Sequence, residues 1–253
     1  MNQASVIDNH LKNRDWPSPL GVLIPAYKAA QSLSRFLPTL VCRIPADNIC
    51  VVDDGSGDDT AAVCEKMQIR CLVLPQNSGK GAALMHGFAQ MTERFEWIIT
   101  MDADGQHAVD DLEGFIQTID SHPQAGIIIG AREISVKKMP ASRVFSNATT
   151  SAILSIMTGR RIFDSQCGYR AYNASFVRNC LIRYSRFEME SEIILRASQH
   201  QRKIFFVPVQ TLYCSDRSHI AHVKDTLRWV GAVVDVWLEI VSKRLFGDKS
   251  SKQ

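Results

Sequence analysis

Two aspartates, Asp102 and Asp104, stand one residue apart directly after a short apolar run, Trp97 to Met101. The run and the turn signal at Gly105 predict a buried strand that ends in a loop. Open α/β sheets bind ligands at the carboxyl ends of their strands, where two such carboxylates can reach one Mg²⁺ or Mn²⁺ ion. An Asp-x-Asp pair is more often a solvated turn with helix N-caps. The metal hypothesis therefore depends on what else the chain supplies for binding phosphate.

A glycine-rich segment, 76–83, lies between an expected strand at 70–74 and an expected helix at 80–92. Its two glycines let a ligand approach the backbone, Lys80 adds a positive charge, and a helix N-terminus favours an anion. A tight turn without a ligand explains the segment equally well when it is taken alone. The Walker A pattern is absent, and no Gly-x-Gly-x-x-Gly follows the first expected strand, which counts against a dinucleotide-binding oxidoreductase.

Alternating strands and helices predict the scaffold that positions these segments. Strands are expected at 20–25, 48–53, 70–74, 97–101 and 125–131, and helices at 29–40, 59–67, 80–92 and 109–120. Such alternation with short connections predicts a single doubly wound, mostly parallel α/β sheet flanked by helices. Further along, helices are expected near 141–158 and 188–200, with a strand at 203–208.

Composition sets limits on the class of protein. The chain has 253 residues, 45% hydrophobic and 22% charged, with a net charge of +3, which is ordinary for a soluble globular protein. Its basic residues lack an interleaved aromatic platform, so no nucleic-acid partner is expected. Seven cysteines without a Cys-x-x-Cys pair indicate reduced thiols in a cytosolic protein. Residues 1–19 form a polar lead-in without a signal-peptide pattern, and no apolar run reaches the length of a membrane span.

The segment 220–246 is predicted to form one long amphipathic helix. Most of its surface is apolar, and its narrow polar stripe comprises Asp225, Arg228, Asp235, Glu239 and Ser242. Its tryptophans and its basic end suit a helix that lies on a membrane surface. Packing on the domain or on a partner subunit explains the same pattern at least as well.

Four motifs occur in a specific order along the chain: Ile-Pro-Ala-Tyr, Val-Val-Asp-Asp-Gly-Ser, Asn-Ser-Gly-Lys-Gly-Ala and Met-Asp-Ala-Asp-Gly-Gln-His. Together they resemble the family-two inverting glycosyltransferases with the nucleotide-diphospho-sugar transferase (type A) fold, especially the dolichol- and undecaprenyl-phosphate sugar transferases. The resemblance covers about Leu20 to Tyr213. It implies a glycosyltransferase domain at 20–214, with a nucleotide-sugar-binding half (20–131) and an acceptor half (132–214), and a C-terminal helix and tail at 215–253.

The resemblance also implies roles for individual residues on the donor side. The nucleotide would be bound by Pro25 and Tyr27 around the base and ribose, Asp54 at the base, and Lys80 and Asp102 near the diphosphate. The Mg²⁺ or Mn²⁺ ion would be held by Asp102 and Asp104, with Gln106 as a further ligand. One departure lies beside this pocket, because Lys28 and Ala29 replace the Asn-Glu that often follows Pro-x-Tyr in the family.

Acceptor residues follow from the same resemblance. The acceptor phosphate would be bound by Arg132, by Arg143 and Ser146, and by the segment Asp164-Ser-Gln-Cys-Gly-Tyr-Arg170 at the floor of the site. Many polyprenyl-phosphate members carry C-terminal transmembrane helices, whereas this chain has only the amphipathic segment. A lipid acceptor therefore implies peripheral contact with the inner face of the cytoplasmic membrane through 220–246.

The expected activity is metal-dependent, inverting transfer of a sugar from a UDP- or GDP-linked donor to a polyprenyl phosphate or another lipid-linked acceptor, as in cell-envelope glycolipid synthesis. A phosphate acceptor needs no general base, but a hydroxyl acceptor does. Glu190 is the candidate base, with Glu188 and Asp164 in reserve, although both glutamates also suit simple compensation of a helix dipole. A nucleotidyltransferase and a non-catalytic sugar-nucleotide-binding or membrane-surface protein are the competing hypotheses.

Overall fold

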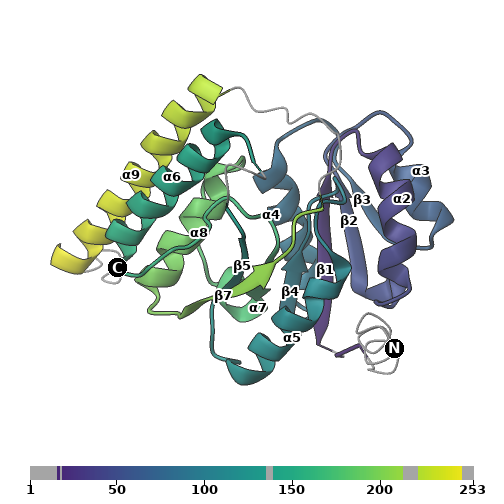
Figure 1. Ribbon diagram of the computed structural model, residues 1–253, viewed down its shortest axis with the longest axis horizontal. Helices are drawn as coiled ribbons and strands as arrows, with labels where there is room; N and C mark the ends of the chain where they lie inside the picture. Colours follow the sequence, from purple (N-terminus) through teal and green to yellow (C-terminus); the bar gives the residue numbers. More distant parts are fainter. Residues whose placement is uncertain (1–15, 18, 135–138, 213–221, 247–253) are drawn as a thin grey trace, which may run out of the picture.

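The computed structural model describes residues 16–17, 19–134, 139–212 and 222–246, and a seven-stranded sheet lies at its centre (Figure 1). Its strands are β1 (Leu20–Ala26), β2 (Ile49–Asp53), β3 (Arg70–Val73), β4 (Trp97–Thr100), β5 (Ile127–Arg132), β6 (Arg170–Asn173) and β7 (Ile204–Val209). Hydrogen-bonded neighbours follow the order β3-β2-β1-β4-β6-β5-β7. The sheet is mostly parallel, which confirms the predicted fold class.

Strand β6 is the one strand of this sheet that the sequence analysis did not predict. It runs antiparallel to both of its neighbours, β4 and β5. Its first residue, Arg170, lies opposite Thr100 of β4 and Ile129 of β5. Because β6 is reversed, its beginning lies at the edge of the sheet where β4 and β5 end.

Helices connect the strands close to the predicted positions. They are α2 (Ala30–Val41), α3 (Thr60–Lys66), α4 (Lys80–Met91), α5 (Leu112–Ser121), α6 (Ala141–Thr158), α7 (Ala174–Arg178), α8 (Glu188–Gln199) and α9 (His222–Phe246), with 3₁₀ turns η1 (Ala46–Asn48) and η2 (Val109–Asp111). Only the short α7 and the 3₁₀ turns were not expected as separate elements.

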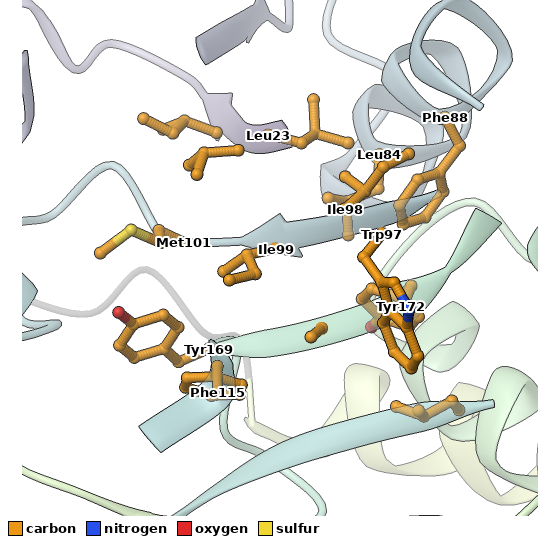
Figure 2. Close-up of a cluster of buried hydrophobic side chains, with 14 of the residues drawn as sticks. Leu23, Leu84, Phe88, Trp97, Ile98, Ile99, Met101, Phe115, Tyr169 and Tyr172 are labelled. Atoms are coloured by element: carbon orange, nitrogen blue, oxygen red, sulfur yellow. The ribbon is translucent and has the colours of Figure 1, made fainter. Parts of the chain in front are cut away.

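The core lies on the central strands β1 and β4, whose side chains are buried throughout. Continuous apolar strands of this kind are typical of a parallel sheet covered on both faces. Figure 2 shows residues of β4, including Ile98 and Ile99, between Leu23 of β1 and aromatic rings farther along the chain. Phe88 of α4, which precedes β4 in the chain, meets Tyr172 of β6 edge to face at 5.1 Å between ring centroids.

The C-terminal helix α9 packs against α8 (Figure 1). Its Trp229 donates a 2.8 Å hydrogen bond from Nε1 to Ser191 Oγ of α8. The helix therefore packs on the domain, which is one of the predicted alternatives. This packing does not bear on a membrane contact of its exposed side. Among the helices described, none is long and apolar enough to cross a membrane. The predicted boundary at 214/215, most of the lead-in and the tail 247–253 lie outside the described residues.

Candidate active site

The predicted functional segments meet at one edge of the sheet. The parallel strands β1, β2 and β4 end there, with Tyr27, Asp54 and Asp102 just beyond them. The reversed strand β6 brings the preceding segment, 164–169, to the same edge. Helix α4 begins there as well, because its first residue, Lys80, contacts Asp102.

A charged cluster surrounds Asp102. Lys80 Nζ lies 2.7 Å from Asp102 Oδ1 and 3.1 Å from Glu190 Oε1 of α8. On the other side of the carboxylate, His107 Nε2 lies 3.3 Å from Asp102 Oδ2. One lysine therefore links the aspartate of the Asp-x-Asp motif to the candidate general base, although the three residues come from distant parts of the sequence.

Electrostatics keep Asp102 and Lys80 ionised. Burial alone would raise the pKa of Asp102, but Lys80 and His107 hold that pKa well below its ordinary value. Burial alone would lower the pKa of Lys80, but the charges of Asp102 and Glu190 hold it above its ordinary value. At neutral pH the aspartate is therefore a carboxylate and the lysine an ammonium.

The second motif aspartate, Asp104, has weaker compensation. Its Oδ1 accepts a 2.9 Å hydrogen bond from the main-chain N–H of Gln106. Burial raises the pKa of Asp104, and the nearby charge of Asp102 raises it further. The pair thus carries an excess of negative charge in a partly buried position, which a cation would neutralise.

These residues fit a divalent metal ion. Their carboxylate oxygens are the hard ligands that Mg²⁺ and Mn²⁺ prefer. Within the described residues, no group of three or more His, Cys, Asp or Glu side chains is arranged to hold a metal. Mg²⁺ in phosphate-binding sites is commonly held by one or two carboxylates, with water and substrate phosphates as its other ligands. The proposed contribution of the Gln106 side chain stays a prediction.

Gly168 fixes the position of the Asp102 carboxylate. A Cβ atom at Gly168 would lie only 2.7 Å from Asp102 Oδ1 and 2.8 Å from its Cγ, so no larger residue fits without displacing the carboxylate. The carbonyl of Gly168 also accepts a 2.9 Å hydrogen bond from Thr100 Oγ1 at the end of β4. A glycine of the predicted acceptor segment therefore lies directly against an aspartate that was predicted for the donor side.

On the predicted nucleotide side, Asp54 joins β2 to the glycine-rich loop. Its two carboxylate oxygens accept hydrogen bonds from the main-chain N–H groups of Ser78 at 2.8 Å and Gly79 at 2.7 Å. Gly79 adopts a φ of 99°, which favours glycine. These contacts position Lys80 at the start of α4. Recognition of the base by Asp54 stays a prediction.

Pro25 and Tyr27 flank the end of β1 with different exposure. Pro25 is buried within the strand and pairs with Val52 of β2, whereas Tyr27 is 47% exposed at the edge of the sheet. Lys28, which departs from the family pattern, has a positive φ of 51°. Its main-chain N–H donates to Ser56 Oγ at 2.8 Å, which anchors the turn after β1. The predicted base pocket is therefore open to solvent at Tyr27.

On the predicted acceptor side, Arg132 forms a two-pronged ion pair with Asp164. Its Nε lies 2.7 Å from Asp164 Oδ2 and its Nη2 lies 2.9 Å from Oδ1. Asp164 is fully buried, and it also accepts from the main-chain N–H of Gln166. Burial alone would lower the pKa of Arg132, but the hydrogen bonds and charge of Asp164 raise it above its ordinary value. The aspartate thus holds the arginine in place and is itself closed off from a ligand.

Arg143 and Ser146 both lie near the start of α6. Gln166 Nε2 donates a 3.0 Å hydrogen bond to Ser146 Oγ, so this end of α6 borders the segment before β6. Arg170 is fully buried, and its guanidinium donates to the carbonyls of three residues: Cys167, Glu190 and Ser165. This geometry gives Arg170 a positioning role beneath the predicted acceptor site rather than a contact with a ligand.

The two glutamates at the start of α8 face different partners. Glu190 is 6% exposed and contacts Lys80, which places it in the cluster with Asp102. Glu188 Oε1 lies 3.6 Å from Arg228 Nε of α9. The structure therefore brings Glu190 to the site and ties Glu188 to the C-terminal helix.

Sequence reasoning missed His107 as a functional residue. The histidine is 7% exposed, contacts Asp102, and has its ring 4.9 Å from that of Tyr169. Its place directly after the Asp-Gly-Gln turn was visible in the motif, but the choice of Asp102 as its partner depends on tertiary packing.

Comparisons with known proteins agree with this geometry. The sequence model described as Glycosyl transferase family 2 matches residues 21–181. The chain is 29% identical over 215 residues to the UDP-N-acetylglucosamine–dolichyl-phosphate N-acetylglucosaminyltransferase of Methanococcus voltae, covering 76% of this chain and 85% of that protein. It is also 29% identical over 199 residues to the undecaprenyl-phosphate mannosyltransferase of Micrococcus luteus, covering 74% and 81% of the two chains.

Among solved structures, the fold matches glucosyl-3-phosphoglycerate synthase from Mycobacterium tuberculosis in complex with Mn²⁺, uridine diphosphate and phosphoglyceric acid. The TM-score is 0.66 at 15% sequence identity, over 96% of this chain and 84% of that one. The same enzyme in complex with Mg²⁺ and uridine diphosphate gives a TM-score of 0.67 at 15% identity, over 92% and 82% of the two chains. At this identity the likeness concerns the fold alone.

Proposed function

This chain belongs to glycosyl transferase family 2 and is a glycosyltransferase, and we propose that it moves a sugar from a UDP- or GDP-linked donor to a polyprenyl phosphate or another lipid-linked acceptor. The observation that carries this proposal is the convergence of Asp102, Asp104 and Lys80 at the edge of the sheet, with Arg132 bordering them. The names of the two relatives, which act on dolichyl and undecaprenyl phosphate, support the acceptor class.

Each half of the site has a part in the reaction. Lys80 lies beside the donor diphosphate, and His107 and Gly168 hold the Asp102 carboxylate in one orientation. Asp102 and Asp104 would hold a Mg²⁺ or Mn²⁺ ion, which would neutralise the charge on the leaving nucleoside diphosphate. Arg132 and Arg143 position the acceptor phosphate, which is already ionised and attacks the anomeric carbon in line with inversion. The division into a donor half, 20–131, and an acceptor half, 132–214, is part of this proposal.

A hydroxyl acceptor is the second candidate, and the position of Glu190 favours it. Glu190 lies in the same cluster as Asp102, within 3.1 Å of Lys80 Nζ. A hydroxyl must lose its proton during transfer, and a buried carboxylate at the site is a suitable base. Glu190→Gln separates the two candidates, because it abolishes transfer to a hydroxyl and leaves transfer to a phosphate largely intact.

The site of action follows from the acceptor. We place the protein in the cytoplasm at the inner face of the cytoplasmic membrane, where it reaches a lipid-linked phosphate through peripheral contact of the 220–246 segment. Cell-envelope glycolipid synthesis is the process that such a product serves.

The test is metal-dependent transfer by the purified chain. A thermal-shift panel of nucleoside diphosphates with and without Mn²⁺ identifies the donor base, and transfer of labelled sugar to detergent-dispersed polyprenyl phosphate measures turnover. Asp104→Ala should abolish turnover without unfolding the protein. Asp110→Ala, which removes a nearby exposed carboxylate paired with Arg43, is the matched control and should keep it.

Full turnover by Asp104→Ala would overturn the metal assignment. A wild-type protein that binds nucleotides but never transfers sugar to any acceptor would instead support the non-catalytic alternative.

A further inference from the structure

Two acidic residues of helix α9, Asp235 and Glu239, bind groups of the neighbouring protein surface. Asp235 Oδ2 accepts hydrogen bonds from Arg183 Nη2 and from Tyr184 Oη, each at 2.9 Å. Glu239 Oε2 lies 2.9 Å from Nη2 of Arg196, a residue of α8 that is only 2% exposed. Asp235 and Glu239, two residues of the predicted polar stripe, therefore form ion pairs and hydrogen bonds within the protein.

The outer side of α9, by contrast, is apolar. A surface helix of a globular protein usually turns its apolar stripe to the core and its polar side to water. The side of α9 that faces the core is also apolar, and Val233 and Val236 are buried there. Other large apolar side chains of α9 are nevertheless exposed on its outer side. We name these the α9 stripe: Leu227 (70% exposed), Val230 (44%), Val234 (40%), Leu238 (54%) and Leu245 (70%).

Helix α6 adds further exposed apolar side chains beside α9. Phe145 is 74% exposed and Ile156 is 81% exposed; they stand about three turns apart and thus on one side of the helix. Both α6 and α9 pack against α8, and Figure 1 shows the three helices at the same end of the molecule. Ser198 joins their C-terminal ends, because its Oγ donates to the carbonyl of Thr158 and its carbonyl accepts from Arg244.

The charges at this end of the molecule favour an anionic surface. The acid Glu239 is contacted by three cations, Arg183, Arg196 and Lys243. Asp235 pairs with Arg183, and Glu192 pairs with Arg196, so these three acids and three cations balance. The positive excess lies in the two outer helices: α6 and α9 together contain five basic residues, Arg143, Lys224, Arg228, Lys243 and Arg244, against three acidic ones, Asp225, Asp235 and Glu239. Arg244, near the end of α9, is exposed. A second copy of the chain would bring the same positive charge, whereas anionic lipid headgroups complement it.

The N-terminal end of α6 connects this region to the acceptor side of the site. Arg143 and Ser146 lie there, and Ser146 accepts from Gln166 of the segment that precedes β6. One turn later, Thr150 Oγ1 lies 2.8 Å from Ser165 Oγ of the same segment. An acceptor phosphate at this end would thus be held beside the helix whose outer side carries Phe145 and Ile156.

We propose that the outer sides of α6 and α9 form one surface that rests on an anionic bilayer, with the N-terminal end of α6 next to the place where a lipid-linked phosphate enters the site. The entry of the phosphate rests on the proposed function, but the docking itself does not. The bilayer covers Phe145, Ile156 and the α9 stripe, and the basic end of α9 meets the headgroups. Helix α6 is thus part of the membrane contact, which the sequence assigned to the C-terminal segment alone.

The test is flotation of the full chain with vesicles of phosphatidylglycerol and phosphatidylcholine, compared with phosphatidylcholine alone. Ile156→Glu with Leu238→Glu should weaken binding to the anionic vesicles about tenfold or more, because two apolar contacts are replaced by charges that repel the headgroups. Val73→Glu is the matched control: Val73 is 59% exposed on the edge strand β3, away from α6 and α9. It should bind as the wild type does.

Activity separates this proposal from the proposed function. The double variant should lose transfer to a vesicle-embedded polyprenyl phosphate and keep transfer to a short, water-soluble isoprenyl phosphate. If no acceptor is ever glycosylated while the flotation pattern holds, the proposed function fails and the docking surface stands.

Two results would overturn the docking surface. One is a double variant that floats with anionic vesicles as well as the wild type. The other is a wild type that binds no vesicles and is a dimer by light scattering, with the double variant monomeric; the surface would then join two copies of this chain.

Discussion

Gly168→Ala tests the geometry of the site with a single methyl group. Gly168 has no positive φ, so an alanine meets no backbone strain and acts only through its Cβ. That atom would lie 2.7 Å from Asp102 Oδ1, and ordinary contacts begin at 3.4 Å. Asp102 Oδ2 is closer still to that atom, so the carboxylate must retreat by about 1 Å, and its contacts with Lys80 and His107 change with it.

The expected effect is large for activity and small for stability. A misplacement of about 1 Å in a catalytic group can lower turnover about 100-fold, so we expect kcat/KM for sugar transfer to fall by a factor of this order. The Mn²⁺ concentration needed for half-maximal rate should rise in parallel. The melting temperature should change little, because the Asp102 side chain is 31% exposed and can move. Initial rates over a Mn²⁺ titration, together with thermal unfolding, measure both effects.

Gly231→Ala is the control for the substitution itself. Nothing lies within 4 Å of a Cβ at Gly231 in α9, and an alanine there should stabilise the helix by about 0.4–1 kcal/mol. Wild-type kcat/KM and metal dependence in Gly168→Ala would refute the reasoning, since the carboxylate would then need no fixed position. A melting temperature that falls sharply would show that Gly168 serves stability rather than the site.

Three further expectations follow from individual contacts. Asp54→Ala leaves two loop amides without acceptors at about 1–3 kcal/mol each, so calorimetry should find both lower stability and weaker nucleotide binding. Arg132→Lys loses the two-pronged contact with Asp164, and steady-state kinetics should show the acceptor KM raised about tenfold with donor binding unchanged. The hydrogen bond from Arg196 lowers the pKa of Glu239 from 4.5 to about 2; its stabilisation is complete above pH 4.5 and is lost as the pH falls toward 2.

Each of these has its own contrary result. Unchanged stability in Asp54→Ala would mean that other acceptors serve the loop. If donor affinity falls in Arg132→Lys as the acceptor KM rises, the arginine belongs to the donor side instead. For the pH effect, Glu239→Gln should melt below the wild type near neutral pH and match it near pH 2; a constant difference across this range contradicts the pKa shift.

Local sequence patterns predicted most of the fold. The apolar run of β1 and the amphipathic pattern of α2 depend on neighbouring residues, and both appear within a few residues of their predicted bounds. Strand β6 was not predicted, because its sequence Arg-Ala-Tyr-Asn has no strong strand pattern and becomes a strand only through pairing with β4 and β5.

The features of the candidate site also fall into two groups, those that local sequence motifs predict and those that they do not. Asp102 and Lys80 lie within recognisable motifs, so the sequence alone predicted that they belong to one site, and the structure brings them into contact. The contact of Gly168 with Asp102, the use of Asp54 by loop amides and the burial of Arg170 all join segments that are distant in sequence. No local pattern carries such information, since the partner is chosen by tertiary packing.

The reversed strand β6 has a consequence for how the two substrates communicate. The short segment before it contains Asp164, which forms an ion pair with Arg132, and Gly168, which lies against Asp102. In the proposed function Arg132 faces the acceptor and Asp102 faces the donor. A displacement of Arg132 by an acceptor would then be transmitted through a few peptide units to the Asp102 carboxylate. Coupling of this kind is reciprocal: an acceptor that tightens donor binding is itself bound more tightly, by the same factor, once the donor is in place.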